Sequence, residues 1–266
     1  MSRYPRSWLF FCGEKVRPKW EDGTAAHTLK KFGVVNRYDL SEEFPILTLR
    51  PVNLKACIDE ILWIWQKKSN NIKDLNSHIW DAWADIDGSI GKAYGYQLGV
   101  KHQYSDGEFD QVDRALLDLK RTPYSRRIMV DMYNHADLHA MGLYPCAYSM
   151  TFNVTDNKLN AILNQRSLDT LVAQGWNVCQ YAILVHMFAQ VSGLEVGELV
   201  HVIADAHIYD RHFPLVEELI RKRKSFPAPK LRVNPFITDF YDFTVNDFVL
   251  EDYQTGLQIP NIPVAV

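Results

Sequence analysis

One cysteine in the sequence has surroundings that suit nucleophilic chemistry. Cys146 directly follows Pro145 at the entrance of a segment in which apolar and polar residues alternate. A cysteine attacks as a thiolate, so it needs a neighbouring positive charge or base. Arg166 ends the next alternating segment, and a hairpin turning near residues 156–157 would bring it close to Cys146. The alternative is a small buried apolar residue, the usual role of a lone cysteine.

Several arginines are candidates for an anion site. The planar guanidinium group matches the oxygens of a phosphate, although adjacent arginines are more often ordinary surface charge. The formal charge of the chain is -3, so nothing attracts nucleic acid to the molecule as a whole and any anion site must be local. The candidates are Arg126 and Arg127 after Ser125, Arg166 with Ser167, and Arg17.

A carboxylate lies in a helix that is apolar almost all round. Asn53 can cap a helix that runs to about Lys67, in which only Asp59 and Glu60 interrupt the apolar surface between residues 56 and 65. Such a helix is buried. The two carboxylates form a small polar window to solvent, which the sequence alone favours, or Glu60 is desolvated. Desolvation would raise the pKa of Glu60 and make it a proton carrier.

Three further polar residues could read a ligand. Asn177 begins a predicted core helix over residues 177–192, where its amide can cap the helix or bind the edge of a heterocycle. Asp205 and His207 are two residues apart in a predicted strand and share one face. His207 and Tyr209 bind a sugar hydroxyl or simply complete this strand.

Length and composition place these residues in one globular domain over residues 1–266, with an atypical segment at 1–25. Helices and strands follow each other without a regular alternation, which predicts the α+β class. No phosphate-binding glycine motif is present. The four cysteines include no C-x-x-C pair and the N-terminal apolar run is too short for a signal peptide, so we expect a reducing, cytoplasmic location.

Together these residues resemble the thymidylate synthase family. The resemblance covers about residues 45 to 266, in the order and nearly the spacing of the family. It is carried by Glu60-Ile-Leu-Trp63, Ile79-Trp80-Asp81-x-Trp83, Tyr94-Gly95, Ser125-Arg126-Arg127, Tyr144-Pro145-Cys146, Gln165-Arg166-Ser167-x-Asp169, Asn177, Asp205-x-His207-x-Tyr209 and Pro263-Val264-Ala265-Val266.

The resemblance implies a mixed β-sheet packed by helices and a homodimer joined back to back through that sheet. It implies reductive methylation of dUMP by methylenetetrahydrofolate, giving dTMP and dihydrofolate. Cys146 would add to carbon 6 of the uracil ring, and Glu60 would handle protons through water. No metal is expected, because the folate supplies both the carbon and the hydride.

The resemblance also implies a role for each site residue. The phosphate contacts Arg126 and Arg127 would come from the second subunit, and Asn177 would favour uracil over cytosine. The catalytic residues would be Cys146, Glu60, Arg166, Asp169 and Tyr94. The dUMP contacts would be Arg17, Arg126, Arg127, Arg166, Ser167, Asn177, His207 and Tyr209. The folate contacts would be Ile79, Trp80, Trp83, Leu143, Asp169, Ala265 and Val266.

Four departures from the family pattern concern the folate side more than the cysteine. Residues 1–25 do not match the usual opening. Ala147 follows the cysteine where many members carry histidine, and Ala204 stands where glycine is common. Residues 173–176, Ala-Gln-Gly-Trp, replace the more usual Gly-x-Pro-Phe.

Other activities remain open. In a pyrimidine nucleotide hydroxymethylase of the same fold, water captures the exocyclic methylene; Trp80, the C-terminal closure and Asn177 argue against it. A non-catalytic RNA binder would use the basic patches, including residues 221–224, and its binding would weaken steeply with salt. A papain-like cysteine hydrolase is a third alternative, but no histidine of this sequence has the companion motif that such an enzyme needs.

Overall fold

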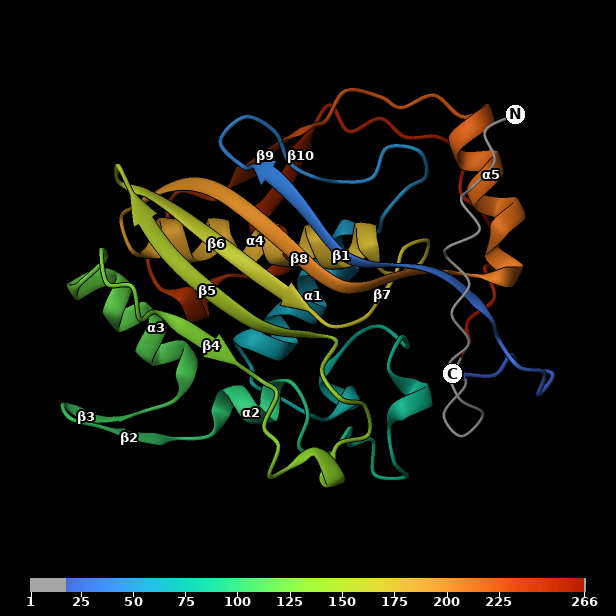
Figure 1. The fold of residues 1–266 in the computed structure, drawn as a ribbon. Coiled ribbons are helices and arrows are strands. Elements are labelled where there is room, and N and C mark those ends of the chain that lie inside the picture. Colours follow the sequence, from blue (N-terminus) through green and yellow to red (C-terminus); the bar gives the residue numbers. More distant parts are fainter. Residues whose placement is uncertain (1–17, 266) are drawn as a thin grey trace.

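A mixed β-sheet organises the computed structural model, which describes residues 18–265. Five of its six strands lie side by side in the order β1-β8-β6-β5-β4, and the sixth, the short β7, pairs with β8 (Figure 1). β6 and β7 run parallel to β8, and the other pairs are antiparallel. The predicted mixed sheet and α+β class are confirmed. The bounds are β1 Thr28–Asp39, β4 Met129–Asp131, β5 Ala147–Thr155, β6 Lys158–Gln165, β7 Leu168–Asp169 and β8 Glu195–Tyr209.

The predicted hairpin is the β5–β6 pair. Asp156 and Asn157 form its two-residue turn with φ of 49° and 63°. This left-handed geometry matches the twist of the flanking strands, and Asp and Asn tolerate it better than most residues. The register pairs Ala147 with Gln165, which places the residues just outside this pair, Cys146 and Arg166, side by side.

Two helices form the core on one side of the sheet. Helix α1 (Leu54–Trp65) is capped by Asn53, whose side chain accepts from the Ala56 amide, as predicted. Helix α4 (Gln174–Val191) is the predicted core helix, but it begins at residue 174 rather than 177. The predicted start was therefore three residues too late. In the structure Gly175 lies inside the first turn because that turn packs closely on Leu47, which an added Cβ would approach to 3.2 Å.

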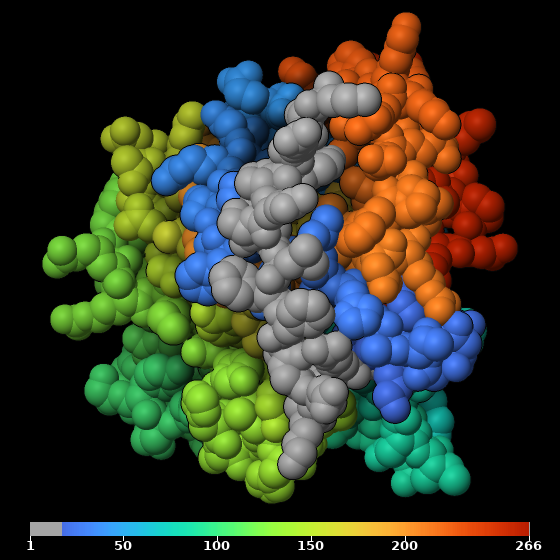
Figure 2. Space-filling model, turned by 45° about the vertical axis from the view of Figure 1, so that its right-hand side comes forward, coloured from blue at the N-terminus to red at the C-terminus, as the bar shows by residue number. Residues whose placement is uncertain are grey.

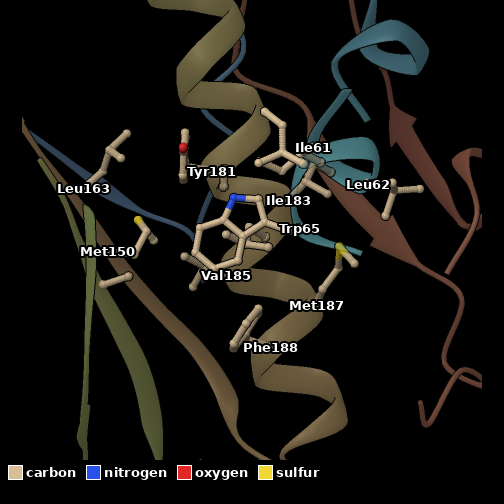
Figure 3. Packing of buried hydrophobic residues seen from close by; sticks show 14 of the residues in the cluster. Ile61, Leu62, Trp65, Met150, Leu163, Tyr181, Ile183, Val185, Met187 and Phe188 are labelled. Carbon is tan, nitrogen blue, oxygen red and sulfur yellow. The ribbon is translucent and has the colours of Figure 1, made fainter. Parts of the chain in front are cut away.

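The interior of the molecule lies between these helices and the sheet. Trp65 of α1 packs edge-on against Tyr181 and Phe188 of α4 (Figure 3). Met150 of β5 and Leu163 of β6 reach the same cluster from the sheet. All five side chains are buried, so the two helices that carry Glu60 and Asn177 are held rigidly against the hairpin that carries Cys146.

The remaining elements surround this core. Residues 18–27 lie against the turn before α5, where Arg211 pairs with Asp22 at 2.7 Å and Trp20 donates to Asp210 (Figure 2). No helix within residues 18–265 is long and apolar enough to cross a membrane. The bounds of the elements around the core are α2 Gly95–Gly99, α3 Gln111–Arg121, α5 Phe213–Lys222, β2 His102–Tyr104, β3 Gly107–Phe109, β9 Lys230–Val233, β10 Phe248–Glu251, and 3-10 turns at Ile72–Asp74, Asp81–Trp83, Leu138–Ala140, Asp210–His212, Phe240–Asp242 and Val245–Asp247.

Candidate active site

The hairpin brings Cys146 and Arg166 together as predicted. The Arg166 amide donates to the Cys146 carbonyl at 2.8 Å, and Nη2 of Arg166 lies 3.6 Å from Sγ of Cys146. The guanidinium is fixed by two more bonds, from Nε to the Pro145 carbonyl and from Nη2 to the Tyr144 carbonyl. A fixed cation therefore faces the sulfur.

Opposing effects act on the Cys146 thiol. Burial raises its pKa above the usual value, while the Arg166 charge and the Tyr94 hydroxyl act to lower it. Burial has the larger effect, so the resting side chain is a thiol at neutral pH. The thiolate, once formed, is stabilised by the guanidinium at its side.

Tyr94 fixes the backbone of Cys146 through a hydrogen bond. The Cys146 amide donates to Oη of Tyr94 at 2.9 Å. Tyr94 itself has a φ of 46°, and Gly95 follows it at a point where an added Cβ would lie 2.3 Å from the Ser69 carbonyl. Only glycine fits there, so the Tyr94-Gly95 pair sets the position of the tyrosine ring.

Glu60 is buried, with 5% of its surface exposed, so the polar window favoured by the sequence alone is wrong. Three N–H groups satisfy its carboxylate: Oε1 accepts from Trp80 at 2.8 Å, and Oε2 accepts from Trp176 at 2.5 Å and Gln180 at 2.8 Å. Burial raises the pKa of Glu60 to about 7, against the lowering effect of these donors. A carboxyl with this pKa exchanges protons near neutral pH.

A chain of side-chain amides joins Glu60 to the middle of the sheet. Gln180 accepts from Asn177 at 3.1 Å, and Asn177 accepts from Gln165 at 3.0 Å. Gln165 bonds Nε2 of His201 at 2.8 Å. Burial lowers the pKa of His201 to about 4, so the ring is neutral and its Nε2–H donates. Asn177 keeps one N–H and one lone pair for a ligand.

Sequence reasoning missed Gln165, Gln180, His201 and Trp176 as members of this network. Gln180 offered a signal, because a glutamine in an otherwise apolar helix three residues after Asn177 must find a buried partner. Gln165 and Trp176 were visible only as neighbours of predicted residues, and His201 only as a residue on the same face of the predicted strand as Asp205 and His207.

The end of β8 carries the predicted hydroxyl-binding residues. Nδ1 of His207 lies 3.0 Å from Asp205, whose other oxygen pairs with Lys30 at 2.9 Å. The predicted common face of Asp205 and His207 is confirmed. The Tyr209 ring stands edge-on to His207 at 5.1 Å, and β7 pairs Asp169 beside His207.

The C-terminal segment approaches Asp169 through His212. Asp169 accepts the amides of Leu171 and Val172, and Nδ1 of His212 lies 3.7 Å from it. Nε2 of His212 lies 2.7 Å from the Pro263 carbonyl. Burial works against the charged ring, but the nearby Asp169 carboxylate and the bond to the Pro263 carbonyl raise the pKa of His212. The segment before residue 266 is thus anchored next to the predicted folate contact.

Of the other predicted residues, Ser167 joins this network through its carbonyl, which accepts from Nε2 of Gln165 at 3.0 Å. Trp83 packs edge-on to Trp80 at 5.7 Å, Ile79 is 41% exposed, and Leu143 and Ala265 are half-buried. Arg126 and Arg127 are exposed, and within residues 18–265 their guanidinium groups form no hydrogen bond or ion pair. Ser167 is half-buried beside Arg166. Arg17 and Val266 lie outside the described residues.

The chain is similar to known proteins over nearly its whole length. A family model described as thymidylate synthase matches residues 13–266. Thymidylate synthase 1 of Bacillus subtilis (strain 168) is 46% identical over 246 residues, 91% of this chain and 88% of the relative. Thymidylate synthase of Bacillus licheniformis is 47% identical over the same shares. The solved structure of thermostable thymidylate synthase A from Bacillus subtilis has a TM-score of 0.89 at 44% identity, covering 94% and 91% of the two chains.

Proposed function

The chain belongs to the thymidylate synthase family, and we propose that it methylates dUMP to dTMP at the site built around Cys146, with methylenetetrahydrofolate as the donor of carbon and hydride. One observation carries the proposal. The sulfur of Cys146 lies 3.6 Å from a fixed guanidinium, on a hairpin packed against the helix that presents the buried Glu60.

The first steps use the cysteine as nucleophile. The Cys146 thiol gives up its proton, and the thiolate, stabilised by Arg166, adds to carbon 6 of the uracil ring. The electron pair of the ring double bond moves into an enolate, which makes carbon 5 nucleophilic. Carbon 5 then attacks the methylene group of the folate, and the new carbon–carbon bond replaces one carbon–nitrogen bond of the donor.

The remaining steps need a base and a hydride. Glu60, through water, accepts the proton from carbon 5, which its pKa of about 7 permits at neutral pH. Elimination of the tetrahydrofolate nitrogen leaves an exocyclic methylene on the pyrimidine. Hydride from tetrahydrofolate reduces this methylene to a methyl group, the Cys146 sulfur departs, and dihydrofolate is the oxidised product.

The polar side chains around the cysteine position dUMP. Arg166 and Ser167 bind the phosphate, joined by Arg17 and by Arg126 and Arg127 from a second subunit. His207 and Tyr209 bind the deoxyribose hydroxyl. The free N–H and lone pair of Asn177 bind the uracil edge, and cytosine would leave these buried groups unpaired.

The proposed folate contacts come from several separate segments of the chain. Trp80 and Trp83 offer adjacent aromatic rings, Ile79 and Leu143 add apolar surface, and Asp169 bonds the pterin. Ala265 and Val266 close the site and exclude water, since His212 holds the preceding Pro263 close to Asp169.

A homodimer accounts for the uncovered side of the sheet. Val35, Met129 and Ile162 are exposed apolar residues of β1, β4 and β6 within the part of the chain that the structure describes, and the core helices cover the other side of the sheet. Back-to-back pairing of two sheets buries such residues and brings in the unpaired arginines at positions 126 and 127.

A cytoplasmic location suits the cysteines. Cys57, Cys146 and Cys179 are free thiols within the described residues, and a reducing compartment would keep Cys146 available for attack.

Product analysis tests the reaction. We expect the purified protein, given dUMP and methylenetetrahydrofolate, to form dTMP and dihydrofolate in equal amounts. Hydroxymethyl-dUMP with unoxidised tetrahydrofolate would instead assign the hydroxymethylase reaction, and no conversion of dUMP would contradict the proposal.

A further inference from the structure

The residue at position 176 bonds directly to the buried carboxylate. Trp176 lies in the first turn of α4, and its Nε1–H donates to Oε2 of Glu60 at 2.5 Å. Gln180, one turn later on the same helix, donates to the same oxygen at 2.8 Å. Trp176 is one of the residues by which this chain departs from the family pattern, so its contact with Glu60 is a property of this sequence.

The two carboxylate oxygens are bonded unequally. Oε2 accepts two N–H groups, which occupy both of its lone pairs, while among residues 18–265 only Trp80 donates to Oε1. A proton that arrives at Glu60 therefore finds a free lone pair on Oε1 alone. We propose that Trp176 is a positioning residue for Glu60: with Gln180 it occupies Oε2, so that Glu60 takes up and releases protons through Oε1. This inference rests on the proposed role of Glu60 in the reaction.

The bond from Trp176 also favours the ionised carboxylate. Among the groups that act to lower the pKa of Glu60, Trp176 has the largest effect, followed by Trp80 and Gln180. The titratable groups around Glu60 are Asp59 and Cys57 on α1 and Tyr181 on α4. Burial raises the pKa of both Cys57 and Tyr181, which stay neutral near pH 7, so Asp59 supplies the only nearby charge of these groups.

Removing the donor should change the protonation of Glu60 in a defined direction. In Trp176→Phe, the carboxylate loses one of three N–H bonds and Oε2 regains a lone pair. We expect the midpoint of Glu60 protonation to rise by about one pH unit, the usual effect of one hydrogen bond to a charged group. The midpoint of the acidic limb of the kcat profile should shift to higher pH by the same amount, while KM for dUMP changes little.

Infrared spectroscopy measures the protonation without turnover. The carbonyl band of the protonated carboxyl is followed against pH and is assigned to Glu60 by its loss in Glu60→Gln. Trp65→Phe is the matched control, since Trp65 is a buried tryptophan that packs on Tyr181 and Phe188 and donates no hydrogen bond to Glu60 (Figure 3). Its midpoint should equal that of the wild type.

If Trp176→Phe does not fold, replacement of the Trp176 indole by benzothiophene keeps the shape and removes only the N–H. An unchanged infrared midpoint in either variant would overturn the inference. A raised midpoint with an unchanged rate profile would support the bond from Trp176 and contradict the proposed role of Glu60, so the two failures are distinguishable.

Discussion

Burial raises the pKa of two residues in this site, Cys146 and Glu60, and different partners act to lower the pKa of each. Arg166 offers Cys146 a positive charge, which stabilises the thiolate during attack. Glu60 receives only neutral N–H donors, so its pKa stays near 7. The nucleophile is therefore stabilised as an anion when it forms, and the carboxyl remains able to exchange a proton at neutral pH.

The titration of Glu60 should appear in the stability of the protein. Folding raises the pKa of Glu60 from 4.5 to about 7, so the native state binds this proton more tightly than the unfolded chain does. The contribution to stability is fully present below pH 4.5 and is lost as the pH rises through about 7, a change of roughly 3 kcal/mol. We expect the free energy of unfolding of Glu60→Gln, relative to wild type, to rise by that amount between pH 4.5 and 8 in urea titrations; a constant difference would contradict the burial effect.

Asn177 should determine the choice of base. In Asn177→Asp the carboxylate offers an acceptor to the exocyclic amine of cytosine, so the kcat/KM for dCMP relative to dUMP should rise about tenfold or more. Unchanged discrimination between the two nucleotides would remove Asn177 from the base contact. Asn164→Asp is the matched control, because Asn164 is a half-buried amide of the β5–β6 hairpin that donates to Ser149 and lies outside the proposed base contact.

The sequence predicted the reactive pair but only part of its surroundings. Cys146 and Arg166 could be placed together because a hairpin with a two-residue turn fixes its own register. The bonds from Gln165 and Gln180 depend on how α4 packs on the sheet. That packing is tertiary, and no local pattern encodes it.

At the scale of elements, α1 is the support of Glu60. The helical spacing of its apolar residues and its Asn53 cap could both be predicted from the sequence, because spacing and capping are local features. The start of α4 could not, because a glycine that normally ends a helix is held inside the first turn by close packing on Leu47.

The cap of α1 gives a prediction at this scale. Asn53→Ala removes the acceptor for the Ala56 amide, so unfolding in urea should become easier by about 1 kcal/mol. Asn53→Asp retains the acceptor and should stay close to wild type. The kcat should be unchanged in both, because Glu60 lies in the second turn and is held by its own three donors. Equal stability of Asn53→Ala and wild type would show that the cap does not stabilise α1.

At the scale of the molecule, the proposed site combines residues of two subunits. Mixing inactive Cys146→Ser with an inactive variant lacking both Arg126 and Arg127 should restore activity. A mixed dimer pairs the intact cysteine of one chain with the intact arginines of the other. Random exchange should give about a quarter of wild-type activity. No recovery, with exchange verified by native mass spectrometry, would mean that each chain supplies its own arginines.

Cys146 is the proposed nucleophile, and turnover and dUMP binding measured side by side in Cys146→Ser test this role. We expect dTMP formation to fall by about 10³-fold or more, because a serine hydroxyl at this position has no base to activate it. The dissociation constant for dUMP, measured by calorimetry, should stay within about threefold of wild type, since the phosphate, sugar and base contacts remain. Near-normal turnover by Cys146→Ser would show that Cys146 is not the nucleophile.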